Sequence, residues 1–112
     1  MIKKIVFCVM AVISFNANAN KFDIAHVKEQ GQDMIIIPLD SNFEYKSDDQ
    51  RRKTMYVLQT CASNARLGGT VVLIWESNGR TKFMAPQPWH GLFRSVDMLW
   101  VAKRINKSLT CR

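Results

Sequence analysis

The sequence predicts a small α+β protein, a two-layer sandwich in which a ββα unit occurs twice. Two observations lead to this prediction. A pair of strand-patterned segments precedes each of two segments with helical periodicity, and turn signals separate the members of each strand pair. Antiparallel strands followed by a helix that returns over one face form two layers. We therefore expect a four-stranded, mainly antiparallel sheet with two helices on one face and one disulfide.

The first nineteen residues have the composition of a cleavable export signal. Lys3 and Lys4 precede an apolar run over 5–15, and residues 17–19 form a small-x-small cleavage site. An apolar run of this length reaches roughly 17 Å as a helix, against about 30 Å of bilayer core, so a membrane anchor is disfavoured. We expect cleavage before Asn20, a single mature domain over 20–112 without a transmembrane segment, and a periplasmic or secreted location.

Cysteine usage predicts one disulfide bond. Cys8 leaves with the leader, so Cys61 and Cys111 form an even pair in an oxidising compartment. A bond that closes a loop of this length is worth ~4 kcal/mol in the chain-entropy model. No C-x-x-C motif indicates a redox role, and the cysteines and histidines have no shared local spacing typical of a metal site.

The first strand pair is predicted over 22–27 and 34–37. The break between them is Gln30-Gly31-Gln32, and the second member is an apolar run that is rich in isoleucine. A run that is apolar at every position is typical of a strand buried on both faces. We therefore expect residues 35–37 to lie centrally in the sheet and to end at Pro38.

A capping box predicts the start of the first helix. Ser47 is the expected N-cap, Gln50 stands three residues later, and two acidic residues occupy the first turn. The helix should run to about Arg66, where Leu67-Gly68-Gly69 provides a stop. Its apolar face includes Cys61, which should point at the core.

The second ββα unit begins with the clearest strand, over 70–76. Asn78-Gly79 predicts a tight hairpin with a return strand over 80–84, which a proline-containing loop over 85–91 should end. A second helix is expected from Leu92, or after Ser95 as N-cap, to about Lys107. Its apolar residues form two opposite stripes, so it should be wedged between layers or face a partner.

Charge is distributed unevenly along the chain. Residues 20–50 contain three lysines and seven acidic residues, whereas residues 51–112 contain eleven lysines and arginines and two acidic residues. The formal net charge is +7 at pH 7, and removal of Lys3 and Lys4 with the leader leaves +5. This asymmetry indicates a basic face; the alternative is ordinary solvated side chains spread over two helices and a hairpin.

No constellation of residues specifies a chemistry. Ser95, His90 and Asp97 have the residue types of a hydrolytic triad, but residues this close at one helix start cannot adopt the required arrangement. Glu76 and Asp97 are the only acids of the basic segment, which poorly supplies the acid pair of a glycosidase. No phosphate loop, dinucleotide motif or zinc motif occurs. We expect a protein that is not an enzyme and that holds no cofactor or metal.

The best candidate for recognition is the loop from Pro86 to Phe93. Stiff loops with an exposed aromatic lose little entropy on binding, and Trp and Arg are favoured at interfaces. The alternative is that the tryptophan of this loop folds back into the core. The expected binding residues are Trp89, His90, Phe93, Arg80, Lys82 and Arg94.

These observations favour an exported protein that binds another envelope protein, as an inhibitor, an immunity protein or an accessory subunit of an envelope or secretion machine. The alternative is a binder of anionic polymer, meaning cell-wall glycan, lipopolysaccharide or translocating DNA, through the basic face. Affinity for a polyanion falls steeply with salt, whereas an apolar protein interface is much less sensitive, so salt dependence distinguishes the two.

Overall fold

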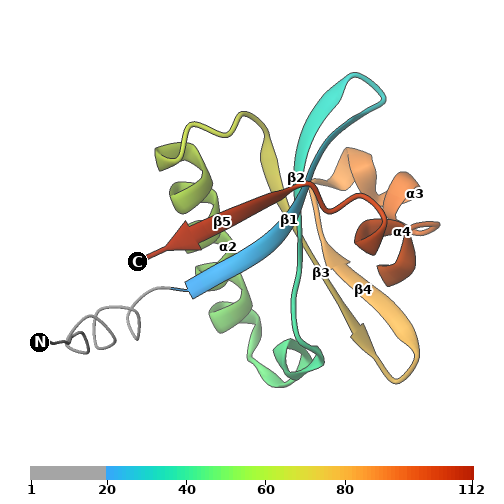
Figure 1. Ribbon diagram of the computed structural model, residues 1–112. Coiled ribbons are helices and arrows are strands. Elements are labelled where there is room, and N and C mark those ends of the chain that lie inside the picture. The colour runs from blue at the N-terminus through green and yellow to red at the C-terminus, as the bar shows by residue number, and fades with distance from the viewer. Residues whose placement is uncertain (1–19) are drawn as a thin grey trace, which may run out of the picture.

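The computed structural model describes residues 20–112, which form a mixed five-stranded sheet with helices on both faces (Figure 1). The strand order is β4-β3-β2-β1-β5. The strands are β1 (Asn20–Glu29), β2 (Gln32–Pro38), β3 (Thr70–Ser77), β4 (Arg80–Met84) and β5 (Lys107–Cys111). The helices are α2 (Asp48–Asn64), α3 (His90–Phe93) and α4 (Met98–Ala102), with short 3-10 turns η2 (Ser41–Tyr45) and η3 (Gln87–Trp89). The predicted leader lies outside the described residues.

The α+β class is confirmed, but the predicted sheet and layer arrangement need correction. The sheet has five strands instead of four, and β2 and β3 pair in parallel while the other neighbours are antiparallel. The parallel pair arises because α2 carries the chain back along the sheet between β2 and β3, the crossover that parallel neighbours require. The two helical segments cover opposite faces of the sheet instead of one (Figure 1).

The elements between residues 20 and 84 follow local sequence signals closely. β1 and β2 form the predicted hairpin, and β3 and β4 form the second one around Asn78-Gly79. Asn78 and Gly79 both have positive φ. At the start of α2 the Ser47 hydroxyl accepts from the Gln50 amide at 3.2 Å, and the Gln50 side chain accepts from the Ser47 amide at 3.0 Å. The predicted capping box is therefore confirmed.

Residues 92–107 do not form the predicted second helix. Two short helices, α3 and α4, replace it, and the N-cap of α4 is Asp97, which accepts from the Trp100 amide at 2.8 Å. The chain then enters β5, and the Asn106 side chain bonds both the amide and the carbonyl of His26 at 2.9 Å. These two bonds fix the start of β5 beside β1, which a continuous helix could not do.

Two hydrophobic clusters lie on opposite faces of the sheet. The strands β2 and β3 contribute alternate residues to both clusters, so Ile35, Ile37, Val71 and Leu73 face α2, while their neighbours face α3 and α4. Residues 35–37 are buried in the centre of the sheet, as predicted.

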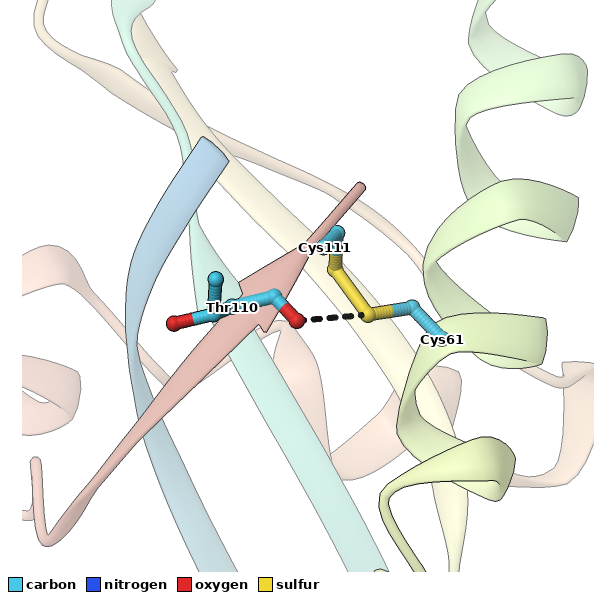
Figure 2. The surroundings of a disulfide bond; sticks show 3 residues. All are labelled: Cys61, Thr110 and Cys111. Carbon is cyan, nitrogen blue, oxygen red and sulfur yellow. Dashed lines mark hydrogen bonds between the residues drawn. A yellow bond between two sulfur atoms is a disulfide. The ribbon is translucent and has the colours of Figure 1, made fainter. Parts of the chain in front are cut away.

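The predicted disulfide between Cys61 and Cys111 is present, with a Cα–Cα distance of 5.7 Å. Cys61 lies on α2, and Cys111 is the last residue of β5, a strand that was not predicted (Figure 2). The Cys61 sulfur also lies 3.4 Å from the Thr110 carbonyl oxygen. A disulfide sulfur carries no proton, so this contact is a dipolar one. The disulfide bond therefore joins α2 to β5, an edge strand of the sheet.

Candidate functional site

The best candidate site is a groove of about 670 Å³ between α2 and the end of β4. We name it the edge groove because it lies at the sheet edge where β4 no longer pairs with β3. Most of its wall is apolar, and Arg52 and His90 supply its basic groups. It is lined by Arg52, Met55, Tyr56 and Gln59 of α2, Thr70 and Val71 of β3, residues 83–86, and His90.

The groove exists because β4 is shorter than β3. Pairing between them begins at Leu73 and Met84, so the first residues of β3 have no β4 partner. Extension of the same register would place Pro86 opposite Val71. A proline has no amide hydrogen to donate, and the Pro86 carbonyl already accepts from the Trp89 amide at 2.9 Å. The chain therefore leaves the sheet and enters η3.

A side chain of α2 partly replaces the missing strand. The Val71 amide donates to Gln59 Oε1 at 2.8 Å, and Gln59 Nε2 donates to the Gly69 carbonyl at 3.3 Å. Gly69 has a φ of 124°, and a Cβ there would lie 2.7 Å from the Asp33 carbonyl oxygen, so the entry into β3 requires glycine. Gly69 thereby allows the close approach to Asp33 that places Thr70 and Val71 in the groove lining.

The α2 wall continues onto an exposed surface. Its four groove residues have the i, i+3, i+4, i+7 spacing of one helical stripe. Tyr56 at the rim is 73% exposed, and Val57 beside it is 55% exposed. Beyond them a second depression of about 460 Å³ extends to the disulfide and β5. Large apolar side chains are thus exposed next to the groove, and exposed apolar patches are typical of interaction surfaces.

The structure divides the predicted binding loop between core and surface. Pro86 and His90 line the edge groove. The His90 Nε2 donates to the Ala85 carbonyl at 2.9 Å, and its ring meets that of Phe83 edge-on at 5.2 Å. Trp89 is half-buried against the second hydrophobic cluster, and Phe93 is 1% exposed. Phe93 is therefore a core residue and is not presented to a partner.

The three predicted cations do not share one position around this loop. Arg80 lies at the end of the hairpin, opposite Ser77, and Arg94 is exposed just after α3. Lys82 points to the α2 side, where its Nζ lies 3.4 Å from Glu44 Oε2. Arg94 thus adjoins the loop, whereas Arg80 lies at the hairpin end and Lys82 pairs with Glu44.

Glu44 is the centre of a polar network that the sequence reasoning missed. Its Oε1 accepts from the Trp75 indole at 2.9 Å, and the Arg51 guanidinium donates to its backbone carbonyl at 3.0 Å. The Trp75 hydrogen bond is the largest cause that lowers the pKa of the Glu44 carboxyl, and the charges of Lys82 and Arg51 add to it against desolvation. The network joins η2, α2, β3 and β4, and its partners are too far apart in sequence for a local signal.

The residue types of a hydrolytic triad do not meet one another. The Ser95 hydroxyl donates to the Leu92 carbonyl at 2.9 Å, His90 bonds the Ala85 carbonyl, and Asp97 caps α4. Within residues 20–112, no group of three or more His, Cys, Asp or Glu side chains is placed to hold a metal ion. The edge groove and the exposed surface of α2 are instead features that suit the binding of a partner.

Comparisons with known protein families, with curated proteins and with solved structures found no match to this chain. The fold and the site define the class on their own: a small disulfide-bonded α+β protein with a mixed sheet and an apolar groove at one sheet edge. Among the described residues, no helix has the length and apolar composition needed to cross a membrane.

Proposed function

We propose that this chain is an exported protein that binds another envelope protein through the edge groove and the adjoining surface of α2. It would act as an inhibitor, an immunity protein or an accessory subunit of an envelope or secretion machine. The observation that carries the proposal is the continuity of the groove with the exposed side chains of Tyr56 and Val57. Exposed apolar patches next to a preformed depression are typical of protein-binding surfaces.

The disulfide supports the location that the proposal requires. A bond between Cys61 and Cys111 is consistent with an oxidising compartment, and it holds β5 against α2 beside the exposed surface. A pre-organised surface loses less entropy on binding than a mobile one. The covalent link therefore favours the α2 side of the sheet as the recognition side.

The test is site-specific photo-crosslinking in the native cell. A photoreactive phenylalanine analogue at Tyr56 should crosslink one envelope protein. The same analogue at Leu99, which is 62% exposed at α4 on the other side of the sheet, is the matched control and should not. Equal labelling from both positions, or none from Tyr56, would contradict the proposal.

Binding of an anionic polymer is the competing proposal, and the charge of the chain supports it. Several cations near the groove already bond carboxylates: Lys82 pairs with Glu44, Arg51 with Asp48 and Arg52 with Asp49. The Arg52–Asp49 pair is exposed on both sides and therefore weak, so Arg52 remains able to contact a polymer. Capture that is lost between about 50 and 200 mM salt would indicate the polymer. Capture that withstands that change and requires Tyr56 would indicate a protein partner.

A further inference from the structure

We propose that the edge groove binds an extended peptide segment with apolar and acidic side chains, which joins β3 as an added strand beyond the end of β4. The proposal rests on the proposed protein-binding function and names how the partner would be held.

The backbone of Val71 has hydrogen-bonding groups that face away from β2. Its amide points away from β2, because it donates to Gln59 Oε1 on α2. The amide and carbonyl of one strand residue point to the same side, so the Val71 carbonyl also faces the missing strand. In the part of the chain that the structure describes, no loop amide or side chain donates to this carbonyl. Val71 therefore presents one open acceptor and one amide whose present partner is a replaceable side chain.

The start of β3 leaves room for a short segment of chain beside it. Thr70, Val71 and Val72 precede the first residue of β3 that pairs with β4. Three strand residues span about 10 Å, so a segment of about three to four residues fits beside them. Pro86 blocks continuation of β4 itself, which leaves this position to a separate chain. A polypeptide backbone supplies the alternating donor and acceptor that Val71 lacks.

The walls of the edge groove indicate which side chains such a segment would carry. Alternate residues of an added strand would face α2, where Met55 and Tyr56 provide an apolar wall. At the same wall Arg52 presents a guanidinium whose ion pair with Asp49 is exposed. A guanidinium has five donors, so it can bind a second carboxylate while it keeps the first. Together with the basic balance of residues 51–112, this favours an acidic residue in the ligand.

The test uses peptides selected from a random library displayed on phage against the purified, oxidised protein. Each selected peptide is synthesised with its ordinary backbone and with N-methyl groups on one or the other set of alternate amides. One methylated form should bind at least tenfold more weakly, because its blocked amides face Val71, and the other should bind nearly as well. In nuclear magnetic resonance spectra, the Val71 amide and the Gln59 side-chain amide should shift on binding.

Protein variants give an independent readout. Gln59→Ala should tighten peptide binding by about two- to tenfold, the worth of one net hydrogen bond, because the ligand no longer competes for the Val71 amide. Ala85→Trp should block the groove and abolish binding. Leu99→Ala is the control and should bind as the wild type does.

Several results would overturn the proposal. They are equal binding by both methylated forms, selected peptides that are consistently basic, resonance shifts confined to other surfaces, or a selection that does not prefer the wild type over Ala85→Trp. The two proposals can also fail separately. A partner crosslinked at Tyr56, combined with insensitivity to N-methylation, would retain the binding function and overturn strand addition. Strand-like peptides without any crosslinked partner would overturn the binding function.

Discussion

The two faces of the sheet are covered in different ways. On one face lies α2, a helix of 17 residues with a capping box and a covalent link to β5. On the other face, α3 and α4 have four and five residues, and η3 has three. Isolated helices shorter than about 12–15 residues are marginal in water, so α3 and α4 depend on packing against the sheet. The α2 face is specified largely by local signals, and the opposite face by tertiary contacts.

The proposed function follows the same division. The edge groove and the exposed Tyr56 belong to the α2 side, where the surface is braced by a long helix and a disulfide. On the opposite side, Phe93, Val96 and Val101 are buried and serve to hold short segments in place. The comparison predicts that core changes on the second face damage folding, whereas surface changes on the first face alter binding.

The largest expected effect is that of Phe93→Ala. Removal of this buried ring should lower the free energy of unfolding by about 3–5 kcal/mol, because it anchors segments that cannot fold alone. Urea denaturation measures the loss, and hydrogen exchange should show residues 85–106 losing protection before α2. Uniform loss of protection over both faces would contradict the division.

Removal of the disulfide tests the α2 face in the same way. The double variant Cys61→Ser, Cys111→Ser should lose about 2–5 kcal/mol, because the 50-residue separation makes the closed loop long. The early loss of protection should then fall on β5 and the end of α2. An unchanged melting temperature under oxidising conditions would mean that the bond contributes nothing to stability.

The N-caps of α2 and α4 allow the same substitution to be compared on the two faces of the sheet. Ser47→Ala should cost about 1 kcal/mol, because it removes one half of a capping box on a long helix. Asp97→Ala should cost only about 0.5 kcal/mol, because the single turn of α4 is held chiefly by packing. Urea midpoints measure both. A larger loss for Asp97→Ala would reverse the assignment of local and tertiary control.

The smallest effect concerns the pH dependence of the Glu44 network. Its folded-state pKa lies below the ordinary value of 4.5, so the carboxylate contributes stability above pH 4.5 that is lost as the pH falls through the folded pKa. Glu44→Gln should therefore differ most from the wild type at neutral pH, and the two should converge in acid. Urea midpoints across this range measure the difference, and a constant gap would contradict the role of the charge.

Two regions of the chain show how much could be predicted from the sequence. Ser47 with Gln50, and Asn78 with Gly79, are local patterns whose hydrogen bonds close within a few residues, and both formed as expected. The segment over 92–107 carries apolar residues on two helical stripes, so periodicity alone could not distinguish one long helix from turns packed on a sheet. The alternation of Leu109 and Cys111 with polar neighbours was a strand signal within reach of the sequence, but no strand was predicted after the expected helix.

By itself, the sequence determined the α+β class, both hairpins, α2 and the pairing of Cys61 with Cys111, because each depends on local propensity or on a count of cysteines. Tertiary structure alone decided the pairing of the fifth strand with β1, the placement of helices on both faces, and the edge groove. Asn106 starts β5 by bonding His26, which is 80 residues away, and the groove requires Pro86, Gln59 and Val71 to meet at one point of the sheet edge. Contacts of this kind depend on strand register and layer order, which are set only when the whole chain packs.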